Sequence, residues 1–186
     1  MSPRAGLDRT SITDAALQLV DTEGIEALSL GKLARRLGVR TPSLYNHVDG
    51  LSGLKHDLAA YCLREVLERT ARSTIGKAGA DAIVAFANAY LSYARETPAR
   101  YTLTLAPDPD NQEVQKLATQ LVEIVQAILA HYHLDYQDEI HAIRSLRSLI
   151  HGFISLQQAS GFRMAVDPQA SFNWMLNLFI SGLEKT

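Results

Sequence analysis

This sequence of 186 residues has little cysteine, no marked excess of either charge and no long hydrophobic run. Cys62 is the only cysteine, which excludes an internal disulfide and any zinc site built from several thiolates. The 18 Lys and Arg residues face 20 Asp and Glu residues, and the net charge of -2 excludes a polycation that coats nucleic acid by charge alone. With 47% hydrophobic and 20% charged residues, the chain has the composition of a folded protein rather than a disordered or collagen-like one.

The sequence lacks the patterns of a signal peptide and of a membrane-spanning helix. Arg4 and Arg9 near the N-terminus are not followed by the apolar run that a signal peptide needs. The longest charge-free stretch near the C-terminus, residues 168–183, contains Asn173 and Asn177 and is shorter than the ~20 residues that span a bilayer. We therefore expect a cytoplasmic protein with no membrane partner.

Motifs for catalysis, cofactors and metal binding are also lacking. Residues 131–141 hold several His, Asp and Glu side chains, but Asp138 and His141 form the nearest approach to a Glu-x-x-His pair. His131 and His133 lie two positions apart and would face nearly opposite sides of a helix. No His-Glu-x-x-His motif and no glycine-rich phosphate loop occurs. The sequence therefore predicts neither an enzyme nor a bound metal or cofactor.

Hydrophobic residues recur at helical spacing almost throughout, and no segment alternates in the manner of a strand. The pattern predicts an all-α fold of about nine helices. Gly24 and Gly38 end the first two helices, the second of which Ser29 caps. Thr41 as the N-cap and Pro42 in the first turn start a short third helix that runs through His47. Further helices are expected at about 52–73, 83–94, 117–132, 137–160 and 168–184, with another short one starting at Thr97-Pro98 and a loop at 107–111.

Residues 30–44 have the spacing of a helix-turn-helix. Ala34 occupies the position where two helices cross closely, and Gly38 can adopt the positive φ that a tight turn needs. Val39 and Leu44 fill the wedge between the helices. A unit of this kind places its second helix, here residues 41–47, in the major groove of DNA.

The side chains around that second helix suit contact with DNA. Arg40 can pair with guanine, Asn46 with adenine, and Pro42 can touch a thymine methyl. Tyr45 and His47 can donate to phosphates. The alternative is an ordinary polar surface helix, which would not need Ala, Gly and Leu at the spacing described above.

The charge of the same region agrees with DNA binding. Residues 32–55 carry five Lys and Arg residues and one acidic residue, so five minus one gives a local charge of +4. Arg4 and Arg9 are expected to reach back toward the DNA as an arm. For Arg35 and Arg36, a solvated face is an equally good interpretation.

The stretch from Leu7 to Leu58 resembles the DNA-binding domain of the TetR family of bacterial transcriptional regulators. The matching residues are 24–29, 32–34, 37–39 and 42–48, and Leu44-Tyr45 followed by His47 is the most specific part. The resemblance implies a three-helix DNA-binding head, residues 1–54, and a helical-bundle body for ligand binding and dimerisation, residues 55–186. It carries base and phosphate contacts onto Ser29, Arg40, Thr41, Pro42, Ser43, Tyr45, Asn46 and His47.

This sequence departs from the family pattern at one phosphate contact. Members often hold a Lys four residues after the matched His, and here that position is Leu51. Lys55, one turn later, is expected to take over the contact.

The C-terminal part, residues 147–183, resembles the WHG-type regulatory domain of some TetR relatives. The matching residues are His151-Gly152-Phe153, Gly161-Phe162 and the run from Phe172 to Leu183. The Trp that names the type is replaced by Ile150.

The last two predicted helices carry apolar faces wider than one core requires. We expect them to form a four-helix interface with a second copy of the chain, with internal core helices as the alternative. The candidate interface residues are Leu149, Leu156, Phe172, Trp174 and Leu178.

Aromatic and aliphatic residues of the body can also line an apolar cavity with phenolic hydroxyls as polar anchors. For each of them taken singly, an ordinary core position is the better explanation. The candidates are Phe86, Tyr90, Tyr93, Tyr101, Leu121, Ile124, Val125, Ile128 and Phe153.

The sequence thus predicts a homodimeric regulator that binds double-stranded DNA at an inverted-repeat operator. We expect a repressor that a small apolar or aromatic ligand releases, because binding of the ligand tilts the long helix starting near Ser52. An activator, a regulator that answers a protein partner, and a helical small-molecule carrier or enzyme without DNA function are the alternatives. The effector itself is not identified by the sequence.

Overall fold

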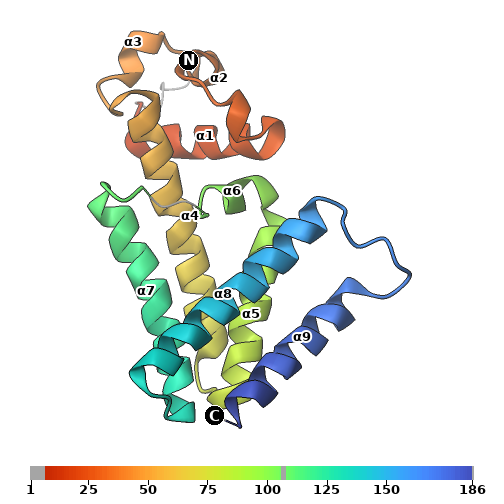
Figure 1. Cartoon of the computed structure of the whole chain (residues 1–186). Coiled ribbons are helices and arrows are strands. Elements are labelled where there is room, and N and C mark those ends of the chain that lie inside the picture. The colour runs from red at the N-terminus through yellow and green to blue at the C-terminus, as the bar shows by residue number, and fades with distance from the viewer. Residues whose placement is uncertain (1–6, 106–107, 186) are drawn as a thin grey trace. The chain divides into compact units, whose positions relative to one another are not determined.

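The computed structural model describes residues 7–105 and 108–185. These described residues form nine α-helices, two short 3-10 helices and no strand, as the hydrophobic pattern predicts (Figure 1). In chain order the helices are α1 (Arg9–Glu23), η1 (Ile25–Ala27), α2 (Leu30–Leu37), α3 (Thr41–Leu44), α4 (Gly50–Thr74), α5 (Gly79–Glu96), α6 (Pro98–Thr102), α7 (Gln112–Leu129), η2 (Ala130–Tyr132), α8 (Tyr136–Gln158) and α9 (Pro168–Leu183). Within the described ranges, no helix is both long and apolar enough to cross a membrane.

The chain forms two compact units, and each unit combines two segments that are separated in the sequence. The first unit contains residues up to Arg64 together with Thr97–Lys116, and the second contains Glu65–Glu96 and the residues from Leu117 onward. The division expected at residues 54/55 falls inside α4, and it leaves residues 97–116 with the body. Those residues return to the first unit because Ala99 and Leu103 pack against its hydrophobic core. The functional division into two domains stays a prediction.

The core of the first unit is built around one face of α1. Ile12, Ala16 and Val20 are completely buried there. Leu33 from α2 and Leu44 from α3 join the same cluster and are equally buried. Because a helix as short as α3 has no stability of its own, its position follows from this tertiary packing.

The ends of α1 and α2 are set by local hydrogen bonds. Asp8 caps α1: its carboxylate accepts from the Ser11 backbone N–H at 2.7 Å, and the Ser11 hydroxyl accepts from the Asp8 N–H at 3.1 Å. The first of these bonds holds the pKa of Asp8 below its usual value. Ser29 caps α2 as predicted, accepting from the Lys32 N–H at 3.3 Å. Gly38 ends α2 with φ +67, the left-handed conformation that the tight turn predicts.

The prediction for the third helix is wrong in its length and its cap. The helix α3 ends at Leu44 instead of running through His47, and Arg40, not Thr41, is its N-cap. The chain continues as a hydrogen-bonded turn in which the His47 N–H donates to the Leu44 carbonyl at 2.9 Å. Val48, which follows this turn, is also buried, with 3% of its surface exposed, and its N–H donates to the Leu44 carbonyl at 3.0 Å.

Several later helices begin or end elsewhere than the hydrophobic pattern predicts. The helices α4, α5 and α7 start at Gly50, Gly79 and Gln112, two to five residues earlier than predicted. The helix α8 ends at Gln158. Asp135 caps α8 as predicted, accepting from the Asp138 N–H at 2.8 Å.

The last helix begins where the sequence predicts. Asp167 caps α9, and Pro168 occupies its first position. Pro107, the first residue of the predicted loop at 107–111, lies outside the described residues.

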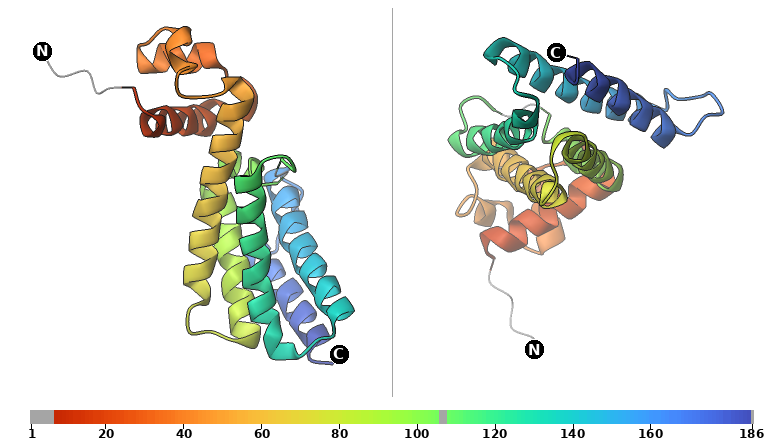
Figure 2. Two further views of the ribbon diagram at one scale, coloured as in Figure 1. Left: turned by 90° about the vertical axis from the view of Figure 1, so that its left-hand side faces the viewer. Right: turned by 90° about the horizontal axis from the view of Figure 1, so that it is seen from below.

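The second unit is a bundle in which α5, α8 and α9 pack against one another (Figures 1 and 2). Phe153 of α8 lies 4.8 Å from Phe172 of α9, measured between ring centroids. Tyr93 of α5 is completely buried, and its hydroxyl donates to the Glu65 carboxylate at 3.2 Å. The Arg69 guanidinium lies over the Tyr93 ring at 5.2 Å, which adds a cation–π contact to the same cluster.

His151 of α8 is packed against a neighbouring aromatic ring. Its ring lies edge-on to Tyr90 at 5.2 Å. Burial, helped by the charge of Arg147, lowers the pKa of His151 to about 4. The folded chain therefore holds a neutral imidazole at neutral pH.

We predict that replacing Gly38 by Ala destabilises the fold by about 1 kcal/mol, because an L-residue at φ +67 is strained. Gly31 is a matched control: it lies in α2, and a Cβ there meets no atom within 4 Å. Gly31→Ala should be neutral or stabilise by up to about 1 kcal/mol. Urea unfolding of the two variants measures the difference. Equal stabilities would contradict the role given to Gly38.

We also predict that the fold loses stability as the pH falls from 7 toward 4, partly through His151. Because the pKa of His151 is about 4 in the folded chain and near 6.5 when unfolded, only the unfolded chain takes up a proton in this range. His151→Gln should remove about 1–3 kcal/mol of this dependence. His141→Gln, on the exposed side of α8, is the control. Thermal unfolding across this range tests the prediction, and parallel curves for wild type and His151→Gln would refute it.

Candidate nucleic-acid interface

The turn that follows Gly38 presents a row of polar and aromatic side chains on the surface of the first unit. Leu44 is completely buried and anchors it, while Tyr45 exposes 60% of its surface. Residues 40–47 therefore combine one buried residue, Leu44, with exposed and half-buried polar and aromatic side chains. The exposed residues are Arg40, Pro42, Tyr45 and Asn46, and the half-buried ones are Thr41, Ser43 and His47.

Arg40 stands at the start of this row. It is the N-cap of α3, with extended backbone angles, and its side chain makes no capping hydrogen bond. Within the described part of the chain, no ion pair engages its guanidinium. An exposed guanidinium of this kind has donors available for the paired acceptors of a guanine edge.

Other basic residues of the region hold the scaffold together. The Lys32 ammonium lies 2.7 Å from the Glu23 carboxylate and lowers the pKa of that carboxyl group. Arg36 donates to the Gln18 side chain at 3.0 Å. Both contacts tie α2 to α1, so two of the charges counted toward the local +4 have a structural role.

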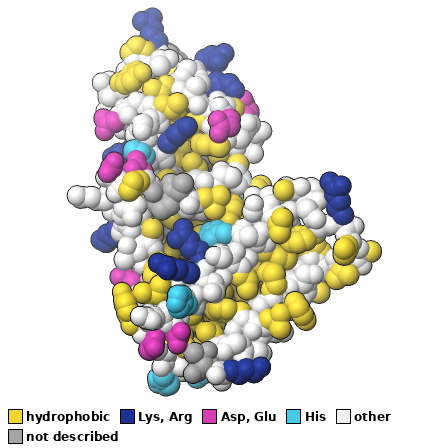
Figure 3. Space-filling model, viewed as in Figure 1, with side chains coloured by type: hydrophobic (Ala, Val, Ile, Leu, Met, Phe, Trp, Pro, Cys, Tyr) yellow, Lys and Arg dark blue, Asp and Glu magenta, His cyan; other side chains and the backbone are white. Residues whose placement is uncertain are grey.

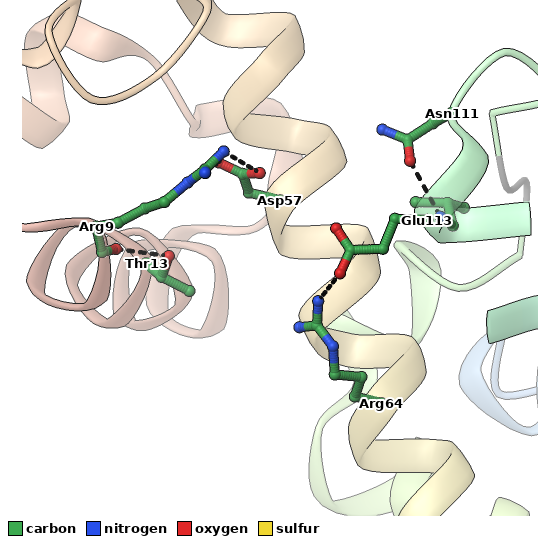
Figure 4. Close-up of polar contacts among 7 residues, drawn as sticks. Arg9, Thr13, Asp57, Arg64, Asn111 and Glu113 are labelled. Atoms are coloured by element: carbon green, nitrogen blue, oxygen red, sulfur yellow. Dashed lines mark hydrogen bonds and ion pairs between the residues drawn. The ribbon is translucent and has the colours of Figure 1, made fainter. Parts of the chain in front are cut away.

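Arg9 does not form the expected arm. Its guanidinium donates to both carboxylate oxygens of Asp57 on α4, at 3.0 and 3.2 Å (Figure 4). This two-oxygen pairing of a planar guanidinium with a carboxylate connects α1 to α4. Arg4, the other predicted arm residue, lies outside the described residues.

The departure from the family pattern at Leu51 has a packing explanation. Leu51 is partly buried against the core of the first unit, a position that a charged side chain would not favour. Lys55 is exposed on the next turn of α4. Its phosphate contact, like that of the capping residue Ser29, stays a prediction.

The predicted ligand-binding residues do not all fall in one unit. Tyr101 of α6 belongs to the first unit, and the other eight belong to the second. The Phe86 and Tyr90 rings lie 6.2 Å apart. Tyr90 also contacts His151, which is not among the predicted ligand-binding residues. The remaining six are buried or partly buried: Tyr93, Leu121, Ile124, Val125, Ile128 and Phe153.

The predicted dimerisation residues separate into surface and core. Trp174, Leu178 and Leu156 expose 64%, 55% and 54% of their surfaces, and Leu149 is partly exposed. Phe172 was wrongly included: it is completely buried against Phe153 within the chain and has no surface for a partner. Helical periodicity could not separate these residues, because α9 is apolar on more than one face.

A hollow of about 680 Å³ lies between α8, α9 and the connection that joins them. Hydrophobic side chains gather over these two helices (Figure 3). The wall of this hollow includes Leu149, Phe153 and Trp174, and the connection adds Phe162 and Val166, which were not predicted as site residues. The sequence signal that could have identified them is the presence of large apolar residues in a connection between two helices, where polar residues are usual.

No cluster of three or more metal-ligating side chains occurs among the residues that the structure describes. The acidic and histidine residues of 131–141 therefore do not converge on one site.

Two family models match the chain. Residues 12–48 match the model described as bacterial regulatory proteins, tetR family, and residues 83–179 match the one described as tetracyclin repressor-like, C-terminal domain. The resemblance inferred from the head is thereby confirmed. The narrower WHG-type assignment of the body stays a prediction.

Similar proteins extend over nearly the whole chain. An uncharacterized HTH-type transcriptional regulator of Bacillus subtilis, YobS, is 35% identical over 184 residues, which cover 98% of this chain and 96% of the relative. A second such regulator, Rv0681 of Mycobacterium tuberculosis, is 34% identical over 183 residues, covering 97% of this chain and 84% of the relative. Among solved structures, a variant TetR from Acinetobacter baumannii AYE in complex with minocycline shares the fold. Its TM-score is 0.74 at 24% identity, covering 97% of this chain and 98% of that one.

These matches agree with the geometry of the first unit. The family model over residues 12–48 spans α1, α2, the Gly38 turn and the exposed row up to Val48. The chain belongs to the TetR family of bacterial transcriptional regulators, proteins that bind DNA through a helix-turn-helix.

Proposed function

We propose that this regulator is a homodimeric repressor, and that each copy reads one half of an inverted-repeat operator with residues 40–47. One observation carries the proposal: a buried Leu44 anchors a turn whose neighbouring polar side chains point outward. Bacterial operators lie in the cytoplasm, where we expect the protein to act. We assign it no catalytic role and no cofactor.

The side chains divide into base readers and phosphate contacts. Arg40 is suited to the two acceptors of guanine, Asn46 to adenine, and Pro42 to a thymine methyl. Phosphate contacts come from hydroxyls, the imidazole and the ammonium, which position the head without reading sequence. This second group consists of Ser29, Thr41, Ser43, Tyr45, His47 and Lys55.

The proposed effector is a small apolar or aromatic molecule bound in the second unit. The aromatic cluster of Phe86, Tyr90 and His151 supports this assignment, since burial keeps His151 neutral and able to hydrogen bond to an uncharged ligand. One solved relative of the same fold is in complex with the small molecule minocycline. Release from DNA requires the ligand to bind the two states of the protein unequally.

The proposed dimer interface is the apolar face of α8 and α9. The exposed Trp174 lies at the wall of the hollow between these helices, so a second copy related by two-fold symmetry can fill one hollow with the other's side chains. Two heads held this way meet half-sites about 34–36 Å apart on one face of DNA.

The proposed function is tested by selecting DNA from a random duplex pool with purified protein at near-physiological salt. We expect enrichment of an inverted repeat. Because a ligand carried through purification can keep the protein off DNA, the selection is repeated after unfolding and refolding. Absence of enrichment in both experiments would refute the proposal.

Arg40→Ala should weaken binding to the enriched duplex by about 1–3 kcal/mol and relax the preference at one base pair in each half-site. Arg72→Ala is the control, because Arg72 is an exposed arginine of the second unit. Fluorescence anisotropy titrations with single-base variants of the duplex measure both effects. A loss that is equal for all duplexes would make Arg40 a phosphate contact only.

Trp174→Ala should weaken dimerisation by about 2 kcal/mol or more if Trp174 is a central anchor of the interface. Tyr136→Ala is the control, since Tyr136 exposes 77% of its surface at the start of α8. Sedimentation equilibrium measures the mass relative to the 20.5 kDa chain. Trp174 is the only tryptophan, so its emission should also shift to the red when the wild-type protein is diluted into monomers. Unchanged mass and emission would exclude this interface.

A further inference from the structure

The segment 97–116 follows a segment of the second unit but belongs to the first unit. The first unit also contains residues 40–47, which are proposed to contact DNA and are called the DNA-contacting turn below. The chain passes between the two units three times, at residues 64/65, 96/97 and 116/117. The first and last of these passages lie inside the continuous helices α4 and α7. The middle one joins Glu96, the end of α5, to Pro98, the start of α6. A change in the second unit therefore has covalent routes to this segment as well as to α4.

Apolar packing and ion pairs fasten the segment 97–116 to the rest of the first unit. His56 of α4 lies 2.6 Å from the Asp108 carboxylate. That carboxylate also accepts from the Asp110 N–H at 2.9 Å. Arg64 of α4 pairs with Glu113 (Figure 4). These two pairs both hold the segment on α4.

One further pair holds the segment on α1 instead. The Arg100 Nε lies 3.0 Å from both carboxylate oxygens of Asp21, and a terminal nitrogen lies 2.6 Å from one of them. The Arg100 side chain is 19% exposed and that of Asp21 33%, whereas Arg64 and Glu113 expose 45% and 60%. A planar fork-shaped pair with reduced solvent screening couples more strongly than an exposed one.

The helix α1 connects this pair to the DNA-contacting turn. Asp21 lies in its last turn, and its first residues lie about 20 Å away at 1.5 Å per residue. At that other end, Asp8 caps the helix, and Ile12 lies in the same hydrophobic cluster as Leu44, the buried anchor of the turn. Between the two ends, Lys32 and Arg36 bind α2 to α1. A rotation of α1 therefore moves the elements that present residues 40–47.

We propose that Arg100 and Asp21 are positioning residues, whose ion pair sets the orientation of α1 and thereby the geometry in which residues 40–47 meet the operator. The inference rests on the proposed function. It assigns a second connection, separate from the long helix α4, through which the second unit controls DNA binding. Neither residue contacts DNA in this assignment.

A double-mutant cycle on binding of the enriched inverted-repeat duplex tests the pair. Arg100→Ala and Asp21→Ala should each weaken binding about tenfold, and the double variant should bind no more weakly than either single one. The reversed pair, Asp21→Arg with Arg100→Asp, should recover most of the loss. Binding to a shuffled duplex should stay the same, because non-specific affinity depends on phosphate contacts that the pair does not make.

Arg64→Ala and Glu113→Ala are the matched controls, since they break an ion pair between the same segment and α4. They should change operator affinity less than threefold, well below the effect of the Arg100 variants. Equal losses for both pairs, additive losses in the Arg100–Asp21 cycle, or no recovery by the reversed pair would overturn the proposal. If the wild-type protein enriches no duplex, the proposed function itself fails, and the two failures are thereby distinguished.

Hydrogen exchange gives a second readout that needs no DNA. In Arg100→Ala, amides in the last turn of α1 and in residues 99–105 should exchange faster, while those of α9 serve as the internal reference. Uniformly faster exchange would show general destabilisation and contradict a positioning role. Unchanged exchange in α1 would also contradict it.

Discussion

One buried stripe along α1 supports everything that the first unit presents to its surroundings. Ile12, Ala16 and Val20 leave no surface exposed, and α2, α3, α4 and α6 all contribute residues that pack onto this cluster. Within the four-residue α3, Leu44 is the buried residue, and Val39 and Val48 on either side pack into the same cluster. The side chains proposed to contact DNA are therefore oriented by packing in which they take no part.

Positive charge in the first unit serves two separate purposes. Lys32 and Arg9 bind neighbouring helices to α1, and Arg100 binds the returning segment to it. Arg40 is left exposed at the start of the turn proposed to contact DNA. Because the chain carries a net charge of -2, attraction to DNA has to come from such local placement rather than from the protein as a whole.

The second unit has the opposite character, with more apolar surface than it can bury by itself. Trp174 and Leu178 stand exposed on α9, while Phe172 of the same helix is completely buried. A hollow of about 680 Å³ beside Trp174 adds to this incomplete face. Such a surface is costly in water, and the proposed contact with a second copy would remove this cost and fix the spacing of the two heads.

The sequence alone determined the helix-turn-helix, because its signals act between residues a few positions apart. Ser29 caps its own helix, and Gly38 makes a turn that few other residues allow. Only the tertiary structure decided that Arg100 pairs with Asp21, 79 positions away, and that Phe172 faces inward. Periodicity shows which face of a helix is apolar, but not which partner covers it. The pairing of distant charges likewise depends on how the whole chain packs, and no local pattern encodes it.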